Sequence, residues 1–292
     1  MKALFLVNER TGKKRSFDVS DVIRRSCLWQ HEVQACGEKD ELPSIVARAE
    51  AEGFDVIVAV GGDGTVHETA KHLIGRNLAL GILPTGSGNG FARHIGLPLD
   101  AALAIDACRA GRVVTIDTAE VNGMPFLGVM GVGFDALIAD RFASSDVRGL
   151  ETYVREGVFA FTHFKADDYE LEANGETLSR RAFVVAVANS GQYGNNARIA
   201  PLASLTDGLL DVVVVEETTI IGATLLLARL FNGTLDKASS VTTLRTSEVR
   251  IKRGGEGPAH LDGEPVTLPA ELVVKVRPLS LRLLVPDATD HL

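Results

Sequence analysis

The chain has 292 residues, of which 46% are hydrophobic and 23% are charged, and its formal net charge is −8. This length is long for one compact core, so two domains are expected. The acidic balance, without a basic tail, argues against a nucleic acid as the main partner, because binding to a phosphate backbone needs clustered Lys and Arg.

The cysteines and the apolar runs indicate the compartment. Cys27, Cys36 and Cys108 form no CxxC pair, which suits a reducing compartment, and each is interpreted as a small buried hydrophobe. The N-terminal apolar run is too short for a signal peptide, and no segment reaches the length of a membrane span. A cytoplasmic protein is expected, and any membrane contact would be peripheral.

The first 120 residues alternate short apolar runs with helical patterns. Strands that are apolar on both faces, separated by amphipathic helices, predict a parallel sheet covered on both sides. The expected strands are 3–7, 54–60 and 78–83. The expected helices are 19–28, 42–52, 65–74 and 101–110.

After about Arg112 the pattern becomes mainly antiparallel β. Asn122-Gly123 and Asn174-Gly175 each separate two apolar runs, which predicts hairpins because type I′ turns need positive φ at both central residues. Helical patterns cover 150–164 and 220–231, and residues 224–230 of the second are expected to be core. The expected strands are 113–121, 126–132, 169–173, 182–188, 209–215, 249–252, 272–276 and 281–285.

A glycine-rich loop follows the buried strand that ends at Val60. Gly61, Gly62 and Gly64 allow a sharp turn and leave room for a ligand beside the backbone. The helix that begins near Thr65 would direct its unpaired N–H groups to the same place, which suits a phosphate. The alternative is a tight turn capped by Asp63 or Thr65.

A second glycine-rich loop, residues 84–93, follows the next strand. Parallel strands end at one edge of a sheet, so the two loops can line one cleft. Thr85 stands where a GxSxG nucleophile motif would need glycine, and no Asp and His complete a triad recognisably. Ser87 is therefore interpreted as a hydrogen-bond donor to a phosphate.

Five motifs, in order along the chain, resemble the diacylglycerol kinase catalytic domain family, which includes bacterial lipid kinases and the sphingosine and ceramide kinases. They are Gly61–Thr65 with Glu68, Pro84–Arg93, Gly131–Ala136, Asp207–Asp211 and His260–Glu264. The resemblance implies a Rossmann-like nucleotide-binding domain over 1–118 and a β-sandwich domain over 119–292, with ATP in a cleft between them. It leaves open whether the last residues pack back on the first domain.

The family pattern also implies roles for single residues. Glu264 would be the proton acceptor, and Asp63 would lie close to the transferred phosphate and the catalytic magnesium. A structural magnesium site would consist of Asp207 and the backbone of Ser204 and Leu209. The implied nucleotide contacts are Asn8, Arg10, Gly61, Gly62, Asp63, Gly64, Thr65, Val66, His67, Glu68, Gly86, Ser87 and Asn89. For Arg10, a solvated loop is the alternative.

Several residues keep two interpretations. Arg93 is a candidate for contact with the acceptor, and Asp135 either faces the acceptor's head group or caps the following helix. Asp262-Gly263 is also a preferred hairpin turn, which does not explain Glu264. His67 and His72 are five positions apart on a helix, so a zinc pair is not expected and a solvated or capping role is preferred.

The sequence departs from the family pattern at two positions, of which the second, Gly90, bears on the acceptor. Glu9 stands where relatives have proline, and Gly90 stands where bacterial lipid kinases have Asp. The leading hypothesis is an ATP- and Mg²⁺-dependent kinase that phosphorylates the hydroxyl of a diacylglycerol-like or sphingoid lipid. The alternatives are NAD kinase-like phosphorylation of a soluble acceptor, and a nucleotide-binding protein without turnover.

The expected partner is a lipid substrate, while a homodimer and peripheral membrane contact stay open. Arg245, Arg250, Lys252 and Arg253 form a candidate basic patch for a membrane surface. Solvated strand faces explain these residues equally well.

Overall fold

A computed structural model of the chain describes residues 1–8, 19–37, 41–144, 164–287 and 289. The chain divides into two compact units. The first consists of Met1–Asp117 and Pro278–Leu292, and the second of Thr118–Arg277.

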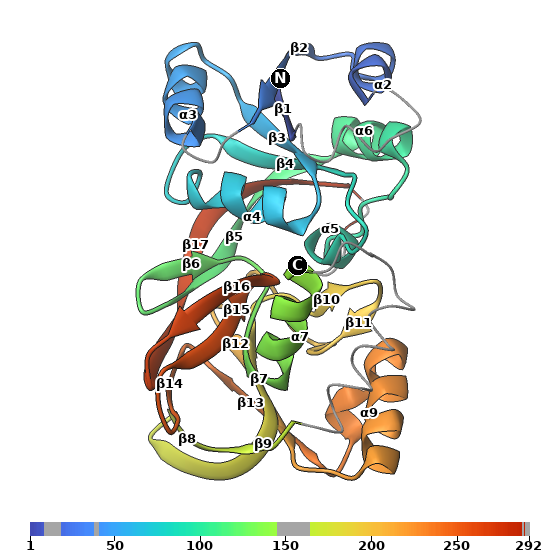
Figure 1. Cartoon of the computed structure of the whole chain (residues 1–292). Coiled ribbons are helices and arrows are strands. Elements are labelled where there is room, and N and C mark those ends of the chain that lie inside the picture. The colour runs from blue at the N-terminus through green and yellow to red at the C-terminus, as the bar shows by residue number, and fades with distance from the viewer. Residues whose placement is uncertain (9–18, 38–40, 145–163, 288, 290–292) are drawn as a thin grey trace. The chain divides into compact units, whose positions relative to one another are not determined.

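The first unit is a parallel sheet with helices on both faces. The strands β2, β1, β3 and β4 lie in this order and pair in parallel, and Leu283 of β17 pairs in parallel with Leu80 of β4. Helices α2 and α6 contact each other on one side of the sheet, and α3 and α4 lie on the other side (Figure 1). Its strands are β1 (Lys2–Asn8), β2 (Gln30–Cys36), β3 (Val56–Gly61) and β4 (Ala79–Pro84). Its helices are α2 (Val19–Ser26), α3 (Leu42–Ala51), α4 (Asp63–Lys71), α5 (Gly90–His94) and α6 (Ala101–Ala110).

This architecture confirms the predicted parallel sheet. The central strands β3 and β4 are buried along their whole length, as their apolar sequences predict. The edge strand β2 was not predicted, because its sequence Gln30–Cys36 is polar and only partly buried. Cys27 and Cys108 are buried, whereas Cys36 on β2 is only partly so.

The second unit is mainly antiparallel β. The path β16-β15-β7-β9-β8-β14-β17 forms its main sheet, and β12 pairs with both β9 and β13. A large apolar core lies beneath these strands, and a smaller one lies between β12, β13 and α9. Its strands are β6 (Met124–Phe126), β7 (Val129–Gly133), β8 (Asp167–Ala173), β9 (Glu176–Ala188), β10 (Gln192–Gly194), β11 (Ala197–Arg198), β12 (Leu210–Glu216), β13 (Val241–Thr246), β14 (Glu248–Lys252), β15 (Gly257–Leu261) and β16 (Glu264–Leu268). Its helices are α7 (Phe134–Ser144), α9 (Ile220–Asn232) and the short η2 (Leu235–Lys237).

Two strands run through both units. They are β5 (Arg112–Val121) and β17 (Glu271–Val285). The segments 272–276 and 281–285, predicted as two strands, are therefore one 15-residue strand. The predicted strand 126–132 is instead divided into β6 and β7. Most of the predicted helix 150–164 lies outside the described residues.

The predicted hairpins are confirmed. Asn122 and Gly123 both have positive φ between β5 and β6, and Asn174 and Gly175 do so between β8 and β9. Asp262 and Gly263 form a third turn of this kind between β15 and β16.

The expectation that 224–230 is core is wrong, because no residue of α9 is buried. Only its inner side, with Leu226 and Leu230, packs against the smaller core. Within the part of the chain that the structure describes, no helix has both the length and the apolar character needed to cross a membrane.

Candidate functional site

The two glycine-rich loops of the first unit meet at the carboxyl ends of β3 and β4. A Cβ placed on Gly86 would lie 2.5 Å from the Cα of Gly62, so the two backbones are in direct contact. The N–H of Thr85 donates to the carbonyl of Gly61 over 2.8 Å, which extends the strand pairing into the loops. The predicted convergence of these two loops is therefore present within this unit, at the sheet edge where α/β proteins bind ligands.

Thr65 fixes the first loop from inside α4. Its hydroxyl lies so close to Gly61 that a Cβ there would approach its Oγ1 to 2.2 Å. The side-chain amide of Asn8, at the end of β1, donates to the same Oγ1 over 3.1 Å. The neighbouring strands β1, β3 and β4 thus contribute to one loop cluster. Position 61 must be glycine, because Thr65 leaves no space for a side chain there.

Asn89 organises the second loop. Its Oδ1 accepts from the N–H of Gly86 at 3.0 Å, and its Nδ2 donates to the carbonyl of Gly86 at 2.8 Å. Arg93 donates from Nε to the carbonyl of Gly88 at 2.9 Å. Ser87 at the tip is exposed. Asn89 and Arg93 therefore hold the loop in shape and leave the Ser87 hydroxyl open to a ligand.

Helix α4 begins at the first loop without a side-chain cap. Its N-cap residue is Gly62, which makes no side-chain hydrogen bond. Val66 and His67 of α4 are both buried, so a nucleotide would meet only their backbone. The expectation of a solvated or capping His67 is thus wrong, because its side chain is buried and it lies inside the helix, not at its end. Glu68 is mostly buried and pairs with Lys71 at 3.0 Å.

Asp63 lies in the first turn of α4 and faces the second loop. Its Oδ1 accepts from the N–H of Phe91 over 3.4 Å, a long bond. Backbone N–H groups at an uncapped helix start, an exposed hydroxyl and one carboxylate form a donor set that fits a magnesium-bound triphosphate, since Mg²⁺ commonly takes one or two carboxylates and completes its shell with phosphate oxygens and water. Arg10 lies outside the described residues.

A surface hollow in the first unit lies elsewhere. Met1, Phe54, Leu78 and Arg282 are among its lining residues, which places it at the amino ends of the strands. Ligands of open α/β sheets bind at the opposite ends, so this hollow is not assigned to the site.

In the second unit, Asp262 ties the turn before Glu264 to the segment between β6 and β7. Its Oδ2 accepts from the N–H of Leu127 at 2.8 Å, and its Oδ1 accepts from Gly128 and Val129 at 2.7 and 3.0 Å. The N–H of Asp262 donates back to the carbonyl of Val129 at 2.9 Å. Asp262 is therefore more than a turn residue: it fixes the start of β16, where Glu264 lies.

A buried polar cluster lies directly behind this turn. Asp135, in the first turn of α7, accepts from the Tyr193 hydroxyl at 2.6 Å, and its Oδ2 is 3.0 Å from Nε2 of His260. The N–H of Gly263 donates to Nδ1 of His260 over 3.3 Å, so in the neutral form of the ring the proton is on Nε2, toward Asp135. The side chain of Asp135 is only 9% exposed. Its carboxylate is thus engaged inside the unit, an arrangement that neither sequence-based interpretation anticipated.

Gly131 provides the space for this cluster. A Cβ there would lie 2.0 Å from an oxygen of Asp135 and 2.6 Å from Nε2 of His260. Burial would lower the pKa of His260, but the nearby Asp135 and, to a lesser degree, Asp262 outweigh it, so the pKa is raised above its ordinary value.

The predicted magnesium loop holds a guanidinium. Asp207 accepts from the N–H of Leu209 at 3.0 Å and also forms an ion pair with Arg245. Arg245 lies 3.5 Å from Asp211 as well. Burial raises the pKa of Asp211, Arg245 lowers it and Asp207 raises it, with a net rise. A divalent cation would compete with Arg245 here. In the described ranges, no three His, Cys, Asp or Glu side chains gather into a metal site.

Sequence reasoning missed Tyr193, His260 as a partner of Asp135, and Arg245 as a partner of Asp207. A tyrosine and an arginine more than 35 residues from their partners give no local signal. Gly131, the first residue of the Gly131–Ala136 motif, was a visible sign of a crowded site, because glycine has no side chain.

A doubly wound sheet whose glycine loops meet at one edge, joined to an antiparallel β unit, is typical of α/β proteins of two parts that bind phosphates. The diacylglycerol kinase catalytic domain model matches residues 2–121, and the YegS C-terminal NAD kinase beta sandwich-like domain model matches residues 128–285. The chain therefore belongs to the diacylglycerol kinase family of the YegS type. It is a phosphotransferase with an alcohol group as acceptor.

Curated relatives agree with this assignment. A probable lipid kinase YegS-like protein of Pseudomonas aeruginosa is 32% identical over 303 aligned positions, covering 100% of this chain and 96% of that protein. An uncharacterized protein of Synechocystis is 31% identical over 248 positions, which cover 82% of this chain and 57% of that longer protein. A solved structure of a diacylglycerol kinase from Bacillus anthracis matches with a TM-score of 0.75 and 19% identity over 99% of this chain and 98% of that one, a likeness of fold.

Proposed function

We propose that the protein transfers the γ-phosphate of ATP, with Mg²⁺, to the hydroxyl of a lipid of the diacylglycerol or sphingoid type. The observation that supports this most directly is the backbone contact between Gly62 and Gly86. It brings two glycine loops, an uncapped helix start and the exposed Ser87 to one sheet edge, where phosphates are bound in α/β proteins.

The proposed chemistry is an in-line displacement. The acceptor oxygen forms a bond to the γ-phosphorus while the bond to the ADP oxygen breaks, and the hydroxyl proton passes to the carboxylate of Glu264. The backbone of Gly62–Glu68 and the hydroxyl of Ser87 would hold the phosphates. Asp63 would be the carboxylate ligand of the catalytic magnesium, which neutralises the charge that develops on the phosphoryl group.

The remaining predicted residues receive supporting roles. Asn8, Asn89 and Arg93 shape the loops through the hydrogen bonds described above, and Asp135 belongs to the cluster behind the Asp262-Gly263 turn. At Ser204, Asp207 and Leu209 we propose that magnesium binds by replacing Arg245 on the Asp207 carboxylate, which makes this second metal site conditional on the guanidinium moving away.

A kinase assay tests the proposal. The full chain is incubated with γ-labelled ATP and Mg²⁺, separately with diacylglycerol, sphingosine and NAD, and labelled products are identified by mass spectrometry. The proposal expects a labelled lipid, no transfer without Mg²⁺, and none with the Asp63→Asn variant. Labelled NADP would favour a soluble acceptor, and ATP binding without transfer to any acceptor would favour a binding protein.

The assay also addresses Gly90, the departure from the family pattern. Gly90 removes a carboxylate from the second loop but leaves Asp63 and Glu264 in place. We therefore expect an active enzyme, and a Gly90→Asp variant should change the preference among lipid acceptors more than the affinity for ATP.

A further inference from the structure

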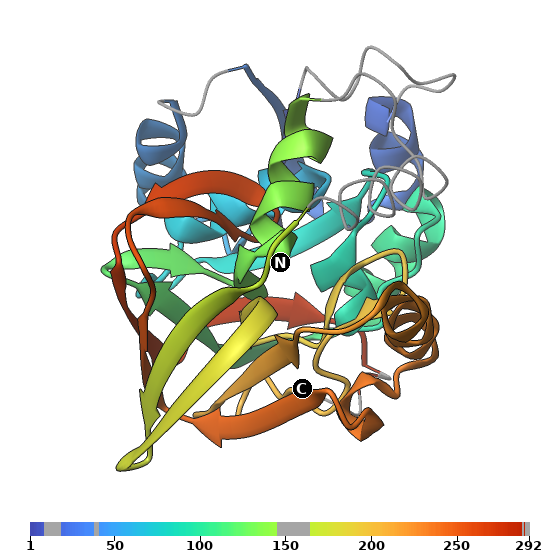
Figure 2. The ribbon, with the colours of Figure 1, turned by 60° about the horizontal axis from the view of Figure 1, so that its bottom comes forward.

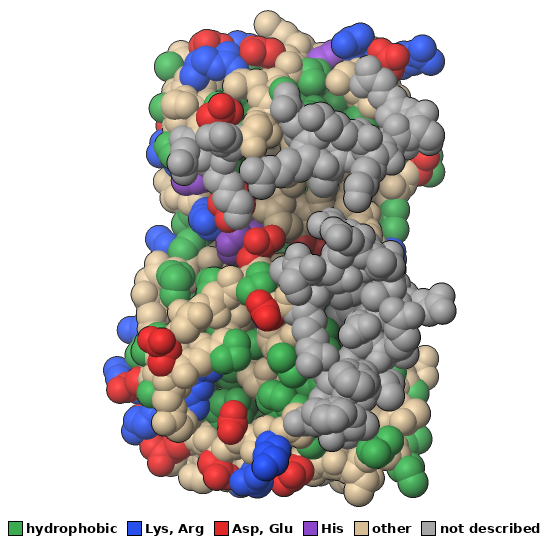
Figure 3. Space-filling model, viewed as in Figure 1, with side chains coloured by type: hydrophobic (Ala, Val, Ile, Leu, Met, Phe, Trp, Pro, Cys, Tyr) green, Lys and Arg blue, Asp and Glu red, His purple; other side chains and the backbone are tan. Residues whose placement is uncertain are grey.

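Helix α9 exposes an apolar face. Ile220 is 59% exposed, Ile221 is 76% exposed and Leu225 is 61% exposed, and Ala228 continues the same side of the helix. Figures 1 and 2 both show α9 on the outer side of its unit, beside β10 and β11, and Figure 3 shows hydrophobic side chains at the surface where Figure 1 places its lower part. A helix at the surface of a protein in water normally carries charged or polar residues on its exposed side.

The helix is well formed although this face is uncovered. The hydroxyl of Thr219 caps its start by accepting from the N–H of Gly222 at 3.2 Å, and Gly233 ends it in the left-handed conformation. Leu226 and Leu230 attach its inner side to the core. No charged residue occurs between Glu217 and Arg229. The exposed apolar side is therefore a stable feature of the surface.

Basic residues gather at the carboxyl end of α9. Arg229 lies in the last turn of α9 and donates to the carbonyl of Thr234. Arg198 lies beside Gly233, since its Cδ is 3.1 Å from where a Cβ on that glycine would be. Lys237 follows in η2. Arg198 and Lys237 are exposed, and neither has a carboxylate partner among the described side chains. An apolar helix face with the basic side chains of Arg198 and Lys237 at one end complements an anionic lipid surface.

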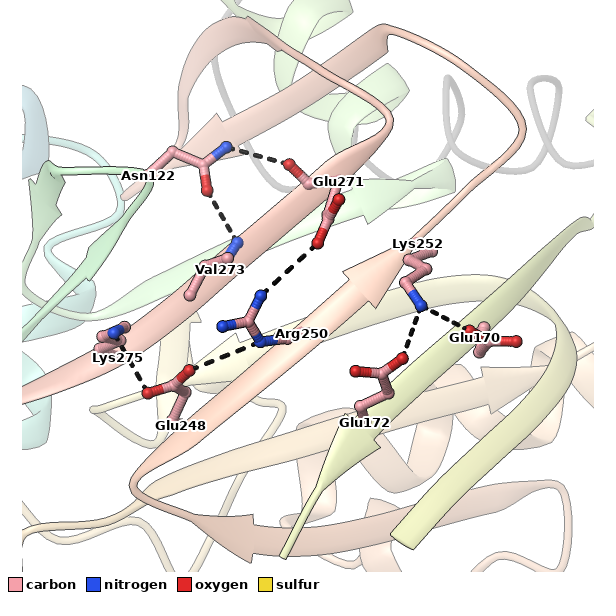
Figure 4. Close-up of polar contacts among 9 residues, drawn as sticks. All are labelled: Asn122, Glu170, Glu172, Glu248, Arg250, Lys252, Glu271, Val273 and Lys275. Carbon is pink, nitrogen blue, oxygen red and sulfur yellow. Dashed lines mark hydrogen bonds and ion pairs between the residues drawn. The ribbon is translucent and has the colours of Figure 1, made fainter. Parts of the chain in front are cut away.

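The candidate basic patch predicted from the sequence, which includes Arg250, Lys252 and Arg253, is neutralised by its neighbours. Figure 4 shows Arg250 and Lys252 of this patch, with the neighbouring Lys275, paired with carboxylates. Arg253 is also engaged, because it donates to the carbonyls of Pro258, Gly257 and Leu268. The pairs are Arg250 with Glu248 and Glu271, Lys252 with Glu170 and Glu172, and Lys275 with Glu248. This face offers no excess positive charge to a membrane.

We propose that the outer face of α9 inserts into the boundary between head groups and acyl chains of an anionic bilayer, with Arg198 and Lys237 on the phosphates. The inference rests on the proposed function, because a kinase whose acceptor is a lipid must reach the bilayer that holds it. A second copy of the chain is a poorer occupant: stable dimers bury about 800 Å² on each partner, with roughly 20 to 30 residues. The α9 face has only a few large side chains.

Sedimentation with vesicles tests the surface. The full chain is mixed with vesicles of equimolar phosphatidylcholine and phosphatidylglycerol, and the bound fraction is measured without ATP. The double variant Ile221→Glu and Leu225→Glu should bind at least about tenfold more weakly, because apolar burial is replaced by charges that an anionic surface repels. The matched control is Leu103→Glu on α6, where the leucine is 59% exposed and its neighbours Asp106 and Arg109 are charged.

A second variant tests the charge. Replacing Arg198 and Lys237 with Gln should weaken binding to the anionic vesicles and make it less sensitive to salt, and leave any weak binding to pure phosphatidylcholine unchanged. Arg229 is kept because it supports the helix end. Thermal unfolding of each variant should match the parent, since the replaced side chains are exposed.

The outcomes separate this surface from the activity. Loss of vesicle binding in the α9 variant, with retained phosphorylation of a short-chain diacylglycerol in solution, supports both proposals. Vesicle binding that depends on α9, in a protein that phosphorylates no lipid, supports the surface and rejects the function. Three results would overturn the proposed membrane-binding face. They are equal vesicle binding by the parent and the α9 variant, no vesicle binding by the parent, and a dimer of the parent that dissociates only in the α9 variant.

Discussion

Gly62 and Gly86 touch through their backbones, and the contact is asymmetric. A Cβ on Gly86 would lie 2.5 Å from the Gly62 Cα, whereas a Cβ on Gly62 would lie 3.1 Å from the Gly86 Cα. Gly86→Ala therefore forces the loops apart, while Gly62→Ala asks for a smaller shift. We expect the Kd for ATP, measured by calorimetry, to rise by at least about tenfold in Gly86→Ala and by less in Gly62→Ala.

The control for this pair is Gly254→Ala. A Cβ at Gly254 has no atom within 4 Å and its φ is not positive, so the substitution is free of clashes. Its affinity for ATP should equal that of the parent. Equal affinity in Gly86→Ala and Gly254→Ala would show that the loop contact does not shape a nucleotide site.

Asp262 should support turnover through Glu264. Asp262→Asn keeps the turn, because Asn also adopts positive φ, but it sets an NH₂ group against one of the three N–H donors. We expect the free energy of unfolding to fall by about 1–3 kcal/mol, and kcat to fall while the KM for ATP stays unchanged.

Denaturant unfolding and steady-state kinetics measure these quantities, with Asp106→Asn as an exposed control. If Asp262→Asn lost stability but kept its kcat, Asp262 would hold the fold without positioning Glu264. If KM for ATP rose together with the fall in kcat, the turn would act on nucleotide binding instead.

Sequence reasoning reached the first unit most fully. Strands such as β3 and β4 are apolar on both faces and are followed by glycines, so both the strands and their loops can be read locally. The edge strand β2 has no such signal. In the second unit, Asn-Gly turns with positive φ are encoded in two residues, which explains why the hairpins at Asn122 and Asn174 were predictable.

Long-range partners were not predictable in this way. Tyr193 lies 58 residues from Asp135, and Arg245 lies 38 residues from Asp207. Pairing of β12 with β13 brings Arg245 to Asp207, and packing of the tertiary fold brings Tyr193 on β10 to Asp135 on α7, so no local pattern records either contact. The prediction that α9 is core failed for a different reason. Its apolar residues indicated burial, but the sequence does not tell whether an apolar helix face is covered by the rest of the protein.

Glu264→Gln should remove turnover and leave the fold intact. The amide has nearly the shape of the carboxylate but cannot accept a proton, so kcat should fall by about 10²- to 10⁴-fold, the usual contribution of a general base. Single-turnover kinetics measures the loss, and thermal unfolding checks the fold. The exposed Glu256→Gln is the control. Normal activity in Glu264→Gln would refute its role as proton acceptor.

The pair of His260 and Asp135 should make stability depend on pH. The pKa of His260 in the folded state is raised above the unfolded value of about 6.5. His260 therefore contributes stability that is complete below the unfolded pKa and is lost as pH rises through the folded pKa. Asp135→Asn removes the main charge that raises the pKa and leaves burial, which lowers it, so the dependence should reverse and stability should fall as pH drops below about 6.5. Denaturant unfolding of both proteins across neutral pH measures it. Parallel profiles would mean that His260 stays neutral throughout.

Arg245→Gln should create a pH-dependent weakness that magnesium relieves. Without the guanidinium, the pKa of the buried Asp211 carboxyl rises further above its unfolded value, so stability relative to the parent is lost as pH rises from about 4. Mg²⁺ that binds the freed Asp207 carboxylate should then raise the Tm of the variant more than that of the parent, by mass action.

Thermal unfolding at several pH values, in EDTA and in Mg²⁺ without nucleotide, measures both effects. Arg250→Gln is the matched control, because its partners Glu248 and Glu271 are exposed and such surface pairs contribute about 0–1 kcal/mol. A variant that follows the parent at every pH would show that Arg245 does not neutralise Asp211. A Mg²⁺ response equally large in the parent would show that the ion displaces the guanidinium readily, and that the Asp207 loop binds metal in the native protein.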